Sequence, residues 1–153
     1  MRIAVGSDHA AFELKEAIEA HLKDQGHEVV DVGTHSLEST DYPSYGEAVG
    51  KLVASGQVER GIVCCGTGVG ISIAANKVPG VRAAVCWNTE VARLTRLHND
   101  ANVLALAGRF IAVPHALMIV DAWLQTEFEG GRHARRVSLI AEIEARHQPK
   151  ADG

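Results

Sequence analysis

The chain has 153 residues, enough for one domain with its own hydrophobic core. Apolar residues make up 46% and charged residues 22%, which excludes a mainly disordered chain, and the net charge of −4 disfavours a general nucleic-acid-binding protein. The sequence has three cysteines, no apolar run near the roughly 18 residues of a membrane span and no signal-peptide pattern. These features predict a cytoplasmic protein that binds no membrane and has no disulfide framework.

Short β-branched runs alternate with longer helical stretches along the whole chain. Strands are predicted at residues 3–5, 27–32, 61–65, 81–86 and 103–107, and helices at 10–25, 43–55, 70–76, 88–98, 114–126 and 132–146. Five strands that each precede a helix predict an α/β fold, with an open five-stranded parallel sheet and helices on both faces. We expect a single domain over residues 1–153, with a frayed tail at 148–153.

In open parallel sheets, ligands bind beyond the carboxyl ends of the strands. This rule directs attention to the segments that follow the predicted strands: Gly6–His9, Gly33–Tyr42, Cys65–Gly70, Trp87–Thr89 and Gly108–Phe110.

The strongest local signal is the glycine-rich turn from Gly66 to Gly70, between a buried strand and a helix. Its glycines leave backbone amides uncovered, and the helix N-terminus adds partial positive charge, so an anion is favoured there. The spacing G-x-G-x-G differs from the dinucleotide fingerprint, and the next strand ends in Cys86 rather than in an acidic residue. An anion site is therefore the favoured interpretation, with a purely structural turn as the alternative.

Cys65 ends the buried strand immediately before this turn. A thiolate at a helix N-terminus is stabilised and can act as a nucleophile or as a base that abstracts a proton. A free cysteine is also commonly a small core residue, and its position alone supports both interpretations. Cys64, one residue earlier, should point to the opposite face of the sheet and belong to the core.

Two further polar groups are candidates for ligand contact. Asp8 and His9 follow the first strand, where Asp8 can cap the next helix, contact a ligand or do both. His98 and Asn99 end a helix, a position where histidine is more often a cap than a catalytic residue. The histidines and cysteines show no metal-ligand spacing, so we expect no metal.

The last predicted helix places Arg132 and Arg136 on one face, which Ile140 and Ile143 continue. We therefore expect this face to point into the protein, where two arginines near a helix N-terminus would bind a phosphate or a carboxylate. A solvated basic patch is the alternative. Arg109, after the fifth strand, is a weaker candidate of the same kind.

Taken together, six motifs over residues 1–146 resemble, in the same order, those of the ribose-5-phosphate isomerase B family, which includes the galactose-6-phosphate isomerase subunits. They are Asp8-His9, Asp41-Tyr42-Pro43, Cys65-Gly66-Thr67-Gly68-Val69-Gly70-Ile71-Ser72, Ala75-Asn76-Lys77, His98-Asn99-Asp100-Ala101-Asn102 and Gly130-Gly131-Arg132-His133-x-x-Arg136-Val137. In one branch of the family, a glutamate occupies the position of Val69. This chain has the thiol of Cys65 and therefore resembles the branch that has a cysteine there.

The resemblance implies a Rossmann-like three-layer sandwich and a homodimer or larger oligomer whose active site lies between two subunits. It implies cofactor-independent interconversion of ribose 5-phosphate and ribulose 5-phosphate, a reaction of the pentose phosphate pathway. Cys65 matches the base and His98 the residue that opens the furanose ring. The remaining matches are with enediolate-stabilising amides (Gly66, Thr67, Gly68, Val69, Gly70), sugar or phosphate contacts (Asp8, His9, Asn99), phosphate contacts (Arg109, Arg132, Arg136) and pocket residues (Tyr42, Thr67).

Three alternatives remain open on the sequence. The substrate can be a six-carbon aldose 6-phosphate such as allose or galactose 6-phosphate. The chain can be a non-catalytic nucleotide- or anion-binding module, which the missing acidic residue near Cys86 disfavours. A thiol redox protein using Cys64 and Cys65 is the third, although a disulfide between adjacent cysteines is strained.

Overall fold

Five parallel strands form a single sheet in the order β2-β1-β3-β5-β4 in the computed structural model, which describes residues 1–150. The strands are β1 (Arg2–Ser7), β2 (Glu28–Asp31), β3 (Arg60–Cys65), β4 (Ala83–Val85) and β5 (Val103–Ala107). The helices are the 3-10 turn η1 (His9–Ala11), α1 (Phe12–Asp24), α2 (Tyr42–Ala54), α3 (Val69–Asn76), α4 (Thr89–Asn99), α5 (Val113–Gln125) and α6 (Arg132–His147). The predicted Rossmann-like α/β fold is confirmed.

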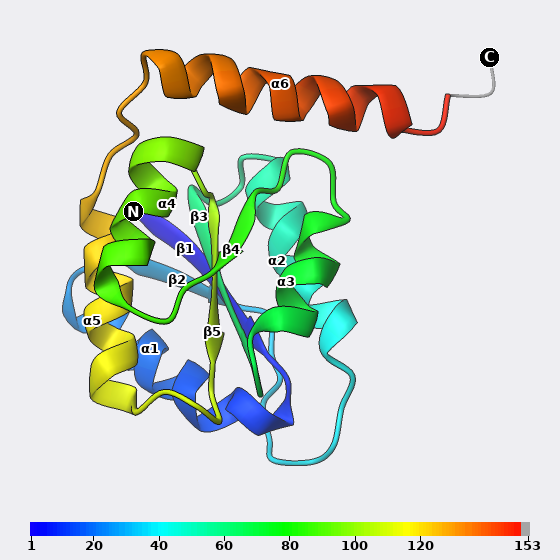
Figure 1. The fold of residues 1–153 in the computed structure, drawn as a ribbon. Coiled ribbons are helices and arrows are strands. Elements are labelled where there is room, and N and C mark those ends of the chain that lie inside the picture. Colours follow the sequence, from blue (N-terminus) through cyan, green and yellow to red (C-terminus); the bar gives the residue numbers. More distant parts are fainter. Residues whose placement is uncertain (151–153) are drawn as a thin grey trace.

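Helices cover both faces of the sheet, as Figure 1 shows. Helices α1, α4 and α5 pack on one face around residues such as Ile18, Leu104 and Trp123. Helices α2 and α3 pack on the other face, around residues such as Val49 and Ile71. The central strands β3 and β5 are apolar at successive positions because side chains on both of their faces are buried.

The predicted elements occur with small shifts at their ends. Because the Asp8 carboxylate accepts a hydrogen bond from the Ala11 amide, at 3.3 Å, the first helical stretch begins as the 3-10 turn η1. Strand β4 is shorter than predicted. The tail expected to be frayed lies partly outside the described residues, which end at 150. Among residues 1–150, every helix is too short or too polar to span a lipid bilayer.

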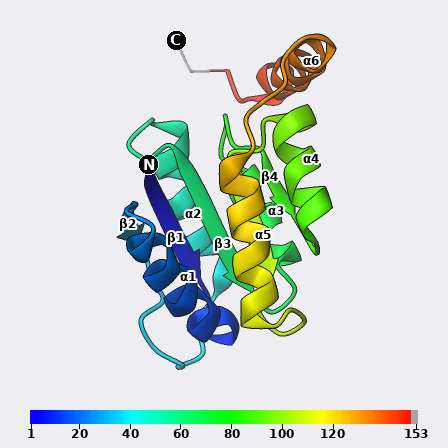
Figure 2. The same ribbon diagram turned by 90° about the vertical axis from the view of Figure 1, so that its left-hand side faces the viewer.

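Helix α6 corrects one prediction. It lies across the end of the sheet at which β1 begins, outside the three layers (Figures 1 and 2). Arg132 and Arg136 are exposed, and Ile140 and Ile143 are 49% and 50% exposed, so the face expected to point into the protein is only partly covered in this chain, in part by the segment 80–82. Its amphipathic pattern was correctly identified, but the pattern cannot tell whether the covering surface belongs to the same chain. Within the described chain, His133 is the one buried residue of α6.

Candidate active site

The sheet has a topological switch between β1 and β3, since the chain runs from β1 to β2 on one side and from β3 to β4 on the other. The carboxyl ends of β1 and β3 lie side by side there, with Ser7 opposite Cys64. An open pocket of about 600 Å³ adjoins the end of β1. Its lining comprises Asp8, His9, Thr40, Asp41, Tyr42, Pro43 and Ser44. This position is where parallel α/β sheets bind ligands.

The glycine loop after β3 is pressed against its neighbours at three points. Gly68 has a φ of +77°, and a Cβ atom there would lie 2.9 Å from the backbone carbon of Leu106. A Cβ on Gly70 would lie 2.6 Å from Cζ of Tyr42, so the tyrosine ring covers this end of the loop. The Arg109 side chain lies beside Gly66, whose oxygen accepts a hydrogen bond from the Arg109 amide at 3.1 Å. Tyr42 and Arg109 therefore both lie against the loop.

Several amides of the loop have no acceptor. The Val69 amide donates to Oγ1 of Thr67 at 3.1 Å, and the Ser72 amide donates to the Gly68 oxygen at 3.2 Å. The amides of Gly66, Thr67, Gly68 and Gly70 donate to no acceptor within residues 1–150. Amides at the start of a helix, left free in this way, are suited to stabilise a developing oxyanion.

The two adjacent cysteines point to opposite faces of the sheet, as predicted. Cys64 belongs to the core under α1 and α5, where burial raises the pKa of its thiol and keeps it protonated. Cys65 belongs to the core under α2 and α3 and is 4% exposed, more than Cys64 or Cys86. Of the three cysteines, Cys65 is the one that adjoins the glycine loop. The thiol therefore packs in this core, at the point where β3 leads into the glycine loop.

Asp8 and His9 hold the rim of the pocket. Oδ1 of Asp8 caps η1, while its Oδ2 has no hydrogen bond within residues 1–150. Nδ1 of His9 lies 3.1 Å from the Thr40 nitrogen and 3.3 Å from the Thr40 oxygen, so the ring can bond to the Thr40 backbone in either tautomer. The capping role of Asp8 is therefore confirmed, with one carboxylate oxygen left over, and His9 holds the loop that precedes α2.

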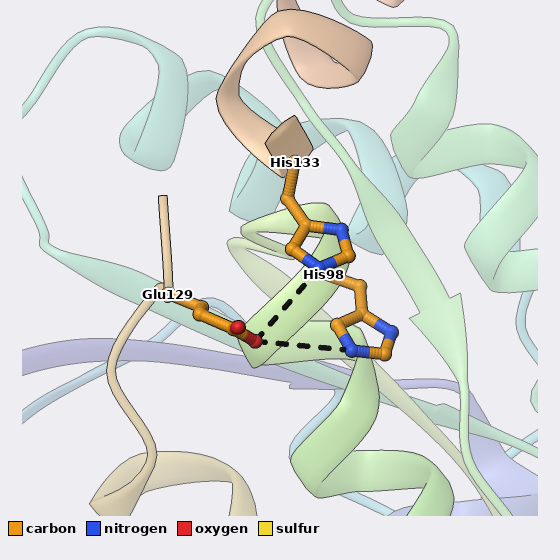
Figure 3. A group of neighbouring side chains, drawn as sticks. All are labelled: His98, Glu129 and His133. Carbon is orange, nitrogen blue, oxygen red and sulfur yellow. Dashed lines mark ion pairs between the residues drawn. The ribbon is translucent and has the colours of Figure 1, made fainter. Parts of the chain in front are cut away.

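The other predicted residues gather at the opposite end of the sheet. His98 and Asn99 end α4, and Arg132 and Arg136 begin α6. Figure 3 shows His98 and His133 beside the Glu129 carboxylate. Their Nε2 atoms lie 4.0 Å and 3.8 Å from its Oε2 atom. Burial lowers the pKa of His133, and the neighbouring His98 ring lowers it further by a smaller amount.

The length of the sheet separates the two groups within one chain. Cys65 pairs with Ala107 at one end of β5, and Gly61 pairs with Val103 at the other end. Four residues of strand span about 13 Å. His98 and Asn99 precede Val103, so they lie beyond the far end of the strand pair from Cys65. The single chain therefore brings together Asp8, His9, Tyr42, Cys65, the loop and Arg109, but not His98, Asn99, Arg132 or Arg136.

Sequence reasoning missed Glu129 as a functional candidate. Its backbone amide donates to the Leu97 oxygen at 3.1 Å, and this bond holds the Glu129 backbone next to the end of α4, where His98 lies. In the sequence, only its position next to Gly130 and Gly131 singled Glu129 out. Its proximity to His98 and His133 could not be predicted, because those residues lie on two different helices.

Comparisons with known proteins agree with this geometry. A family model described as Ribose/Galactose Isomerase matches residues 3–140. Ribose-5-phosphate isomerase B of Escherichia coli K12 is 55% identical, over 95% of this chain and 97% of its own. The solved structure of Clostridium thermocellum ribose-5-phosphate isomerase B is 57% identical, with a TM-score of 0.96 over 97% of this chain and 100% of its own. The Mycoplasma genitalium enzyme, solved with bound ribulose-5-phosphate, is 42% identical, with a TM-score of 0.91 over 94% of this chain and 96% of its own.

Replacement of Gly68 by alanine tests how tightly the loop is fitted. The positive φ and the contact with Leu106 should together lower the free energy of unfolding by about 2–5 kcal/mol. Gly56 is the matched control, because its φ is +78° and no atom lies within 4 Å of its Cβ position. Gly56→Ala should cost only about 1–2 kcal/mol. Urea unfolding measures both, and equal losses would contradict the packing argument.

Proposed function

The chain belongs to the ribose/galactose isomerase family, and we propose that two copies of it together interconvert ribose 5-phosphate and ribulose 5-phosphate. The relatives named above support the reaction that the sequence predicted, and one was solved with ribulose-5-phosphate bound. The single observation that carries the shared site is the separation of Cys65 from His98 by the length of the sheet. The roles of individual residues are our proposal.

The chemistry begins at the carboxyl edge of the sheet. In the open-chain aldose, Cys65 as thiolate removes the proton from C2, and the C–H electron pair becomes the new double bond between C1 and C2. The negative charge that develops on oxygen is stabilised by the free loop amides. Transfer of the hydroxyl proton from the C2 oxygen to the C1 oxygen, and return of the abstracted proton to C1, give the ketose. No electron leaves the sugar, so the reaction needs no redox cofactor.

The second copy supplies the remaining groups. His98 of one protomer opens the furanose ring of a sugar bound at the Cys65 loop of its partner. Arg132 and Arg136 bind the phosphate from the same side, with Arg109 already beside Gly66. A remote phosphate held by fork-shaped guanidinium groups gives binding energy that orients the reacting carbons.

The exposed apolar side chains support this assembly. Ile143 and Leu139 on α6 are 50% and 44% exposed, and Ile73 on α3 is 55% exposed. A two-fold contact between identical protomers would cover α6 and would build two equivalent active sites at once. Burial of Ile140 and Ile143 in this contact would aim the arginines of the same helix face at the partner's loop.

We also propose that the protein works in a reducing, cytoplasmic environment. All three cysteines are buried free thiols, and the chemistry assigned to Cys65 requires its reduced form.

Replacement of Cys65 by alanine or serine tests the base. Proton transfer by a positioned group is worth about 10²–10⁴-fold in rate, so kcat should fall by that factor in both variants. Binding of ribose 5-phosphate, measured by calorimetry, should persist because the loop amides and arginines are retained. Cys64→Ser is the matched control and should keep its turnover, since Cys64 faces the other core. Turnover of the Cys65 variants near the wild-type rate would assign the base elsewhere.

Replacement of Ile143 by glutamate tests the assembly. A charge in the proposed contact should give monomers in sedimentation analysis, and the monomers should lose isomerase activity because no chain holds a full site. Met118→Glu is the control, as Met118 is 60% exposed on α5 and outside α6. A fully active Ile143→Glu monomer would show that one chain suffices.

A further inference from the structure

His98, Glu129 and His133 form a compact cluster at the start of α6, drawn in Figure 3. Their nearest ligand-type atoms all lie within 4.8 Å of one another. The two imidazole rings are stacked, with centroids 4.2 Å apart and planes inclined by 13°. Each ring directs Nε2 toward the same carboxylate oxygen of Glu129.

One nitrogen of the His133 ring is buried without a hydrogen-bond partner within the described residues. The residue is 5% exposed, and the nitrogen concerned is Nε2. The Glu129 oxygen is 3.8 Å away, beyond hydrogen-bonding distance. A buried ring nitrogen without a partner is costly, so a group that binds between the three side chains would be stabilised.

The donor set suits zinc. Two imidazole nitrogens and one carboxylate oxygen are ordinary Zn²⁺ ligands, and three protein ligands leave a fourth position open. Ligand atoms around a tetrahedral zinc ion are about 3.3 Å apart, so the cluster must contract and the rings must tilt out of their stacked arrangement. The backbone is already fixed, since the Glu129 amide donates to Leu97 and the His133 amide donates to Gly130, both at 3.1 Å.

We propose that His98, Glu129 and His133 bind Zn²⁺, and that the bound ion inhibits the isomerase. The ion occupies the ring nitrogen of His98 that would otherwise exchange a proton with the furanose ring. The binding claim stands on the cluster alone, whereas the inhibition claim rests on the proposed function. The positive charges of Arg132 and Arg136 at the start of α6 oppose the cation, so the affinity is moderate and the site fills only when free zinc rises.

Sequence spacing gave no sign of this site because its ligands come from α4, the connection after α5, and α6. The expectation that the reaction itself needs no metal is unaffected, because the ion blocks the site.

Equilibrium dialysis of the full-length protein against Zn²⁺ alone tests binding. Loss of the carboxylate in Glu129→Gln should weaken the affinity by about tenfold or more, and loss of a nitrogen ligand in His133→Asn by about 100-fold or more. His115→Asn, an exposed histidine on α5, should bind zinc like the wild type. Unchanged affinity in the Glu129 and His133 variants would overturn the site.

Substitution with Co²⁺ gives a readout independent of activity. The visible bands of a tetrahedral ion should appear without the ultraviolet charge-transfer band of a cobalt–sulfur bond. A cobalt–sulfur band would place the metal on Cys65 and overturn the proposal.

Two reactions then test inhibition. Zinc should slow the conversion of ribose 5-phosphate, which must be ring-opened, and Glu129→Gln should need about tenfold more zinc for half-inhibition relative to its own uninhibited rate. Exchange of the C1 proton of ribulose 5-phosphate in deuterated water needs no ring opening and should be spared. Equal loss of both reactions would refute the assigned role of the ion at His98. Zinc binding that depends on Glu129 in a protein without isomerase activity would sustain the site and refute the proposed function.

Discussion

The opposed directions of strands and helices constrain everything else in this molecule. In a parallel α/β sheet, all strands end at one edge, and each helix returns the chain to the other edge before the next strand begins. A residue at the end of a strand and a residue at the end of a helix therefore lie at opposite edges. Cys65 ends β3 and His98 lies in the last turn of α4, so one chain cannot bring them together.

This constraint explains why α6 carries groups that have no function within a single chain. The helix carries two arginines and an apolar face, yet within the described chain about half of the surface of Ile140 and Ile143 on that face remains exposed. A second copy would resolve both features at once, because the contact that buries the isoleucines also delivers the arginines. Binding energy for the dimer and binding energy for the phosphate would then come from one element.

The chemical groups at the two ends of the sheet differ, and each set suits one part of the proposed reaction, ring opening or proton transfer. The carboxyl edge of the sheet provides the Cys65 thiol and, in the loop that follows it, free amides, two kinds of group that suit the movement of a proton next to a carbonyl. The amino edge provides imidazoles and guanidiniums, which are suited to ring opening and to binding a phosphate. A metal ion trapped at the amino edge would stop the first part and leave the second intact.

Much of the fold follows from the sequence, because continuous apolar runs such as β5 and glycine or proline breaks mark the elements directly. The opposite orientations of Cys64 and Cys65 follow from strand alternation alone. The environment of α6 did not follow, since periodicity identifies an apolar face but not the surface that covers it. The cluster at Glu129 did not follow either, because it depends on how three distant segments meet.

A heterodimer of two inactive variants tests the shared site most directly. One protomer carries Cys65→Ala and its partner carries His98→Asn, with different affinity tags so that only the mixed dimer is purified. If each site combines the thiol of one protomer with the imidazole of the other, one of the two sites is intact, and about half of the wild-type activity should return. A mixed dimer as inactive as its parents would show that the thiol and the imidazole do not act together across the two subunits.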